Sequence, residues 1–247
     1  MAIQKKTYVD FLGMPEPEVH LVHVGGQTGV AAGTDNKPNQ WMFANGSCLE
    51  IWHGEASALI VPVKVAGVGL DISLDAVDND QCEIIVADSL NSTGPCYTIG
   101  TDAAFRFDVK LLIDDVSDYS PVAVGFRKQA AFVDDTPAFA DWKTAYTDMA
   151  AIGPEGSATA DIEIYHSLNG NDATVDTTDN WADGETKTLS VLVSAAGVVT
   201  YLIDGAAPTT TLAQTFDDGD VVIPFIACVG QATGDPVTLV SWFSGHQ

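Results

Sequence analysis

Alternation of apolar and charged residues constrains the fold of this chain more than any other feature of its sequence. In residues 105–111, phenylalanine, valine and leucine occupy every second position, with Arg106, Asp108 and Lys110 between them. Successive side chains of a β-strand point to opposite faces, so this pattern predicts a strand with one buried and one solvated face. Residues 161–165 alternate in the same way and predict a second such strand.

Short apolar runs separated by turns predict further strands. Residues 189–193 and 198–203 form a hairpin, in which Gly197 supplies the backbone freedom that the turn needs. The other predicted strands cover residues 58–65, 68–75, 82–87, 122–127, 221–229 and 237–243. Many short strands with Gly and Pro turns between them predict an all-β fold, an antiparallel β-sandwich.

One segment has helical rather than strand-like spacing. Thr136 and Pro137 are typical of a helix start, with an N-cap residue followed by proline at the first helical position. Aromatic residues and Met149 then follow at steps of three or four, and Gly153 is a plausible stop. The sequence therefore predicts one short helical segment near 137–150, packed on the sandwich.

The chain divides into two unequal parts. Residues 1–40 are rich in Gly and polar residues and predict an extended N-terminal arm, while residues 41–247 are expected to form the sandwich domain. The start lacks the apolar run of a signal peptide, and no stretch is long and apolar enough to span a bilayer. We therefore expect synthesis in the cytoplasm and no membrane span.

The charge of the chain excludes two classes of partner. With 34 acidic and 10 basic residues, the formal net charge is −24. Hydrophobic residues still make up 46%, which argues against a disordered acidic tail. Binding to nucleic acid or to an anionic membrane needs clustered Lys and Arg, so neither partner is expected.

Asp161 and Glu163 are the candidate catalytic residues, and they point to glycoside hydrolysis. They lie two apart on a predicted strand, which places their backbones roughly 7 Å apart on one face. A retaining glycosidase needs two carboxyl groups about 5–5.5 Å apart. Because acidic residues are so common here, a solvated strand face is the simpler interpretation, and we expect the protein not to be an enzyme.

Metal and sugar sites are suggested by two kinds of sequence. The acidic turns 75–80, 114–118 and 217–220 could supply oxygen ligands to Ca²⁺, but none has EF-hand spacing, so we expect no cofactor. Trp181 lies in the polar stretch 178–184 and is the candidate for stacking on a sugar ring. Its alternative role is as a core residue.

Several stretches together resemble the concanavalin A-like (laminin G-like) jelly-roll domain. They are residues 105–113, 122–127, 180–186, 197–205 and 222–225. The chain is most similar to the type of this domain found in structural proteins of tailed phages. The resemblance implies a jelly-roll β-sandwich, and the chain lacks the E-x-D-x-x-E stretch of the glycosidase branch.

The same resemblance implies a virion protein that decorates or cements the outer surface of a phage capsid. Its expected partners are the major capsid protein and further copies of itself, for example as a trimer. The scarce basic residues Lys5, Lys6, Arg127 and Lys128 are then the expected contacts with the shell. A glycan-binding, lectin-like module on a virion or cell surface, with Trp181 at its site, is the alternative, and a glycoside hydrolase is a third reading.

Overall fold

The computed structural model describes the chain in twelve stretches, and all structural statements below refer to them. They are residues 6–10, 19–20, 39–43, 48–54, 63–65, 67–72, 81–85, 96–117, 119–130, 146–156, 159–229 and 237–247. This part of the chain contains strands and turns but no helix. It therefore holds no helix long and apolar enough to cross a membrane.

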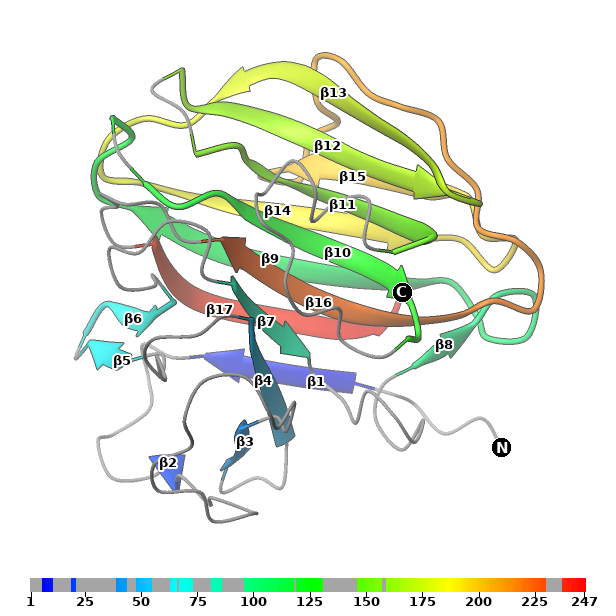
Figure 1. The fold of residues 1–247 in the computed structure, drawn as a ribbon, viewed down its shortest axis with the longest axis horizontal. Helices are drawn as coiled ribbons and strands as arrows, with labels where there is room; N and C mark the ends of the chain where they lie inside the picture. Colours follow the sequence, from blue (N-terminus) through cyan, green and yellow to red (C-terminus); the bar gives the residue numbers. More distant parts are fainter. Residues whose placement is uncertain are drawn as a thin grey trace.

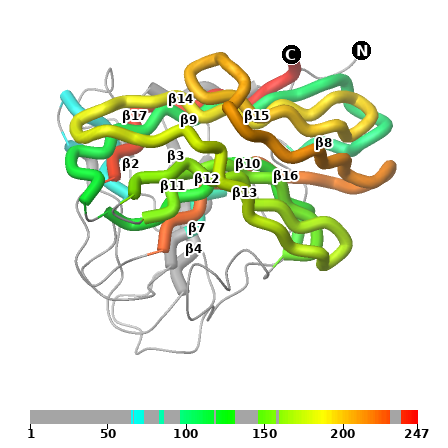
Figure 2. Tube along the Cα trace, turned by 90° about the horizontal axis from the view of Figure 1, so that it is seen from above, coloured from blue at the N-terminus to red at the C-terminus, as the bar shows by residue number. Residues whose placement is uncertain are grey.

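Two antiparallel sheets form two layers (Figures 1 and 2). The smaller sheet has the order β15 (Val199–Ile203), β14 (Glu185–Val193), β9 (Phe105–Ile113), β17 (Val237–His246), β6 (Gly69–Asp71) and β5 (Val63–Val65), and β1 (Lys6–Asp10) also pairs with β17. The larger sheet has the order β13 (Asn171–Asn180), β12 (Asp161–Leu168), β11 (Asp148–Pro154), β10 (Val122–Lys128), β16 (Val221–Val229), β7 (Gln81–Ile85), β4 (Cys48–Gly54), β3 (Asn39–Phe43) and β2 (Val19–His20). A short strand, β8 (Tyr97–Thr98), pairs with β16.

The main core lies between the two sheets. On β9, the apolar side chain at every second position is fully buried and the charged ones between them are not, as the sequence predicts. Phe105 of β9 packs edge-on against Phe126 of β10, with ring centroids 5.0 Å apart. The all-β, antiparallel sandwich is therefore confirmed.

The larger sheet is also buried on its outer face. A second apolar cluster lies there, made of Ala123, Tyr146, Met149, Ala151, Tyr165, Phe225, Ala227 and Val229. Strands β10, β11 and β16 consequently have both faces buried, and their sequences are apolar at nearly every position.

The predicted helix near 137–150 is wrong where the structure describes it. Residues from Asp148 onward form β11, and Gly153, the expected helix stop, lies inside that strand. Because β11 is buried on both faces, its apolar residues show no period of two, and Met149 fits a helical spacing by coincidence. Phe139 and Trp142 of the expected helix lie outside the described residues.

Two strands have features that the sequence did not predict. β13 is a polar edge strand that pairs with β12 on one side. On its other side, the carbonyl of Thr177 accepts a hydrogen bond from the backbone N–H of Thr210. β1 lies within the predicted arm, yet it pairs with β17 from Lys6 to Asp10. The boundary at residue 40 stays a prediction, and β3 spans it.

Candidate functional site

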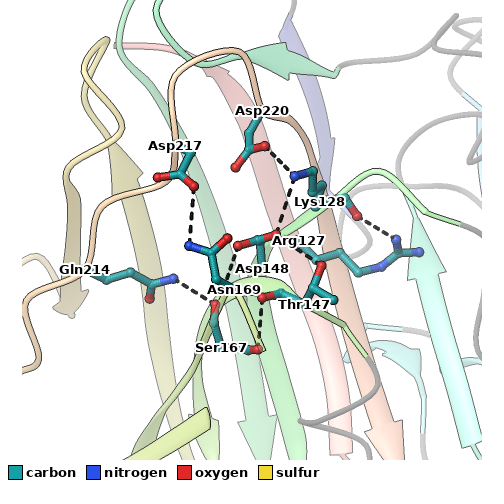
Figure 3. Close-up of polar contacts among 9 residues, drawn as sticks. All are labelled: Arg127, Lys128, Thr147, Asp148, Ser167, Asn169, Gln214, Asp217 and Asp220. Carbon is teal, nitrogen blue, oxygen red and sulfur yellow. Dashed lines mark hydrogen bonds and ion pairs between the residues drawn. The ribbon is translucent and has the colours of Figure 1, made fainter. Parts of the chain in front are cut away.

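A group of polar residues gathers at one end of the larger sheet (Figure 3). Lys128 ends β10, Asp148 begins β11, Asn169 follows β12, and Asp217 and Asp220 precede β16. These strands are antiparallel neighbours, so the end of one lies beside the start of the next. We refer to these five residues as the Lys128 cluster.

Lys128 is held between two buried carboxylates. Its Nζ lies 2.6 Å from Oδ1 of Asp220 and 3.5 Å from Oδ2 of Asp148. The side chain of Lys128 is 44% exposed, whereas that of Asp148 is 4% exposed and that of Asp220 is 8% exposed. The hydrogen bond with Asp220 raises the pKa of Lys128, so the ammonium is charged at neutral pH. One side of this ammonium faces solvent and the other is fixed by the protein.

Asp148 also fixes the neighbouring turn. Its Oδ1 accepts the backbone N–H of Asn169 at 2.9 Å, and its Oδ2 accepts the hydroxyl of Thr147 at 3.1 Å. Asn169 has a φ of 52°, in the left-handed region that asparagine tolerates better than most residues. Its side-chain amide donates to Oδ2 of Asp217 at 3.4 Å, and both of these side chains are exposed. The cluster thus presents an ammonium, an amide and a carboxylate to solvent.

Gln214 is a buried residue that lies just before Asp217 and Asp220 in the chain and supports this end of the sandwich. This residue is 4% exposed, and its Nε2 donates to the Met149 carbonyl at 2.8 Å. Its Oε1 accepts the hydroxyl of Tyr201 at 2.9 Å. Met149 belongs to the larger sheet and Tyr201 to the smaller one, so Gln214 connects the two sheets just before Asp217 and Asp220.

Arg127 anchors the end of β10 from the outer face. Its Nε lies 2.6 Å from Oε1 of Glu83, and Oε2 of the same glutamate accepts the hydroxyl of Tyr146 at 2.6 Å. The guanidinium lies 4.2 Å from the centre of the Tyr146 ring, and Nη1 donates to the Lys128 carbonyl at 3.2 Å. Arg127 is fully buried. It is therefore not available for the expected contact with a capsid, and it holds Lys128 in place instead.

Solved structures share this architecture, although no known family model matches the chain and no curated protein matches its sequence. The carbohydrate recognition domain of Emp46p in its potassium-bound form matches with a TM-score of 0.53 and 11% identity, over 78% of this chain and 87% of that one. The exoplasmic/lumenal domain of VIP36 in its Ca²⁺-bound form matches with a TM-score of 0.52 and 10% identity, over 83% and 86%. The same domain bound to Ca²⁺ and Man3GlcNAc matches with a TM-score of 0.51 and 10% identity, over 81% of this chain and 83% of that one. The chain has the concanavalin A-like jelly-roll fold. The expected jelly-roll sandwich is thereby confirmed, whereas the expected place in a phage virion stays a prediction.

Trp181, the expected sugar platform, belongs to the core of the sandwich. It is 3% exposed, and its indole N–H donates to the Glu185 carbonyl at 2.9 Å. A ring this deeply buried has no face open to a sugar. Its polar neighbours Asn180, at the end of β13, and Asp183, in the turn before β14, are exposed, and this polar surrounding is why the sequence predicts an exposed ring.

The candidate catalytic acids lie toward the end of β12 opposite to Asn169 of the Lys128 cluster. Asp161 and Glu163 are partly buried on β12, where Oδ1 of Asp161 accepts the side-chain amide of Asn180 at 2.7 Å. The register of β12 with β13 shifts between the two acids. Lys6 is the first residue of β1, and Lys5 lies outside the described residues. The expected lack of enzymatic activity stays a prediction.

The predicted calcium turns do not bring together a metal-binding group in the described part of the chain. No three His, Cys, Asp or Glu side chains there are placed to hold a metal ion. In turn 217–220, Asp217 accepts from Asn169 and Asp220 pairs with Lys128. Turn 75–80 and Asp118 lie outside the described residues.

Proposed function

We propose that this protein is a glycan-binding module without catalytic activity and that the Lys128 cluster is its binding site. The observation that carries the proposal is the half-exposed ammonium of Lys128, fixed by two buried carboxylates beside the exposed side chains of Asn169 and Asp217. The shared fold supports it, because the similar structures include a carbohydrate recognition domain and a domain solved with Man3GlcNAc.

The exposed groups of the cluster match the chemistry of sugars. A sugar hydroxyl both donates and accepts hydrogen bonds, and neighbouring hydroxyls present several such groups in a fixed pattern. Lys128 donates, the carboxylate of Asp217 accepts, and the amide of Asn169 does both. Asp148 and Asp220 hold these groups before a ligand arrives, which lowers the entropy lost on binding.

The charge of the cluster selects against acidic glycans. Three carboxylates and one ammonium leave it with a net charge of −2, on a chain whose charge is −24. Sialylated or sulfated glycans would be repelled by both. The ligand we propose is therefore a neutral oligosaccharide.

Capsid decoration, the role expected from the sequence, is a second candidate. The net charge of −24 favours it, because such a protein would be repelled by packed DNA and would face outward on a shell. Of the basic residues expected to contact the shell, Lys128 has a half-exposed side chain in this structure. Co-sedimentation of the chain with purified capsids tests this role, and wild-type binding by Lys128→Glu would exclude Lys128 from the contact.

The glycan proposal is tested by applying the full chain to an array of neutral, sialylated and sulfated glycans. We expect retention on neutral glycans, with affinity measured by calorimetry. Asp217→Ala and Asn169→Gly, whose glycine tolerates the left-handed backbone, should each weaken binding by about 5- to 30-fold. Asp114→Ala is the matched control, since Asp114 is an exposed aspartate at the far end of β9. Binding to acidic glycans alone, or equal binding by all three variants, would contradict the proposal.

A further inference from the structure

An ammonium group lies beside two buried carboxylates at this end of the sandwich. Similar structures were solved with potassium, in Emp46p, or with Ca²⁺, in VIP36. In the Lys128 cluster, the positive charge next to the buried carboxylates is an ammonium group that belongs to the chain itself.

The oxygen atoms of the cluster do not suit a metal ion. Both oxygens of Asp148 accept hydrogen bonds from the protein, and Oδ1 of Asp220 lies 2.6 Å from Nζ of Lys128. Of these two buried carboxylates, only Oδ2 of Asp220 has no hydrogen-bond partner, and one free oxygen cannot hold a metal ion by itself. Ca²⁺ takes six to eight oxygen ligands, which exceeds what the described residues place here. A divalent ion bound to these carboxylates would also lie within a few ångströms of the ammonium and be repelled by it.

We infer that the ammonium of Lys128 is the resident cation of this cluster and that its carboxylates are ordered without a metal ion. Buried carboxylates are costly unless they are paired, and Lys128 pairs with two of them. The lysine is fixed to the end of β10, where Arg127 holds its backbone carbonyl. A chelator cannot remove such a cation.

This inference concerns the control of the proposed glycan site, because it makes binding there independent of calcium. It is measured through stability and does not need a ligand. If no glycan binds, the proposed function fails, while the comparison of unfolding temperatures still decides the identity of the cation.

The experiment compares thermal unfolding of the full chain in EDTA and in millimolar CaCl₂. We expect the wild-type midpoint to be the same in both. Lys128→Met should lower the midpoint by roughly 4–8 °C, since it leaves two buried carboxylates without their cation. Lys110→Met, which removes an exposed lysine of β9, should lower it by less than about 2 °C. Lys128→Arg keeps the charge and should stay close to the wild type.

Each outcome decides the inference. Unfolding of Lys128→Met alone, while Lys128→Arg folds, supports the inference. The inference would be overturned if EDTA lowered the unfolding midpoint of the wild type by several degrees but did not lower that of Asp220→Asn. Equal midpoints for Lys128→Met and Lys110→Met would overturn it as well. If calcium changes the unfolding midpoint of Asp220→Asn as much as that of the wild type, the ion binds elsewhere in the chain, which agrees with the inference.

Discussion

Gln214 contributes to the stability of the sandwich by joining its two sheets. Its amide connects a carbonyl of the larger sheet with a hydroxyl of the smaller one, and the residue is buried. Gln214→Leu should lower the free energy of unfolding by about 2–3 kcal/mol, because the Met149 carbonyl and the Tyr201 hydroxyl would be left buried without this partner. Urea unfolding measures the loss.

A double-mutant cycle separates this hydrogen bond from packing effects. Tyr201→Phe should cost about 1 kcal/mol in the wild type and almost nothing in the Gln214→Leu background, where the partner is already lost. Equal costs in the two backgrounds would show that the two side chains are not coupled.

Strands β10 and β11 depend on two glycines for their close approach. A Cβ on Gly125 would clash with the Ala150 carbonyl oxygen, and one on Gly153 would clash with the Val122 carbonyl oxygen. Gly125→Ala should therefore cost more than about 3 kcal/mol, since backbone atoms of a central pair would have to separate. Ala123→Gly, on the same face of β10, is the matched control and should cost about 1 kcal/mol. Similar urea midpoints for the two variants would be inconsistent with this packing.

Some strands can be predicted from the sequence and others cannot. β9 was predicted because one face is buried and the other is not, which produces alternation. The sequence of β11 predicts part of a helix because both faces of the strand are buried, and that of β13 predicts no strand because it is a polar edge strand. Periodicity in the sequence reports a difference in polarity between two faces. β11 lacks it because both of its faces are apolar, and β13 lacks it because the residues on both of its faces are mostly polar.

The Lys128 cluster was only partly predictable for a different reason. The sequence predicts roles for Lys128, as a capsid contact, and for turn 217–220, as a calcium turn. Asp148 and Asn169 gave no local signal. The strand ends that carry these residues meet through the antiparallel register of the sheet, which a single sequence does not specify.

The whole molecule should lose stability at alkaline pH for a reason beyond its net charge. Burial raises the pKa of Tyr97 and of Tyr119 to about 12, whereas an unfolded tyrosine titrates near 10. The stability that this shift contributes is complete below pH 10 and is lost as the pH rises through about 12, because the unfolded chain releases these protons first.

This dependence is measured by urea unfolding at a series of alkaline pH values, together with the tyrosinate absorbance of the folded protein. We expect Tyr97, Tyr119, Tyr165 and Tyr201 to ionise late, because burial raises the pKa of each. Tyr97→Phe should make the loss of stability between about pH 10 and 12 less steep. Ionisation of every tyrosine near pH 10 in the folded protein would contradict the burial of these four hydroxyls.

The order of strands in the smaller sheet has a consequence for the speed of folding. β9 lies between β14 and β17, and both of these strands come much later in the chain. Pairing between distant segments requires large loops to close before any contact is gained, so such topologies fold in milliseconds to seconds rather than microseconds. Until β14 and β17 arrive, both edges of β9 and its row of phenylalanine, valine and leucine side chains are open to other chains. The nascent protein is therefore most prone to aggregation after β9 has been made and before its two neighbours have.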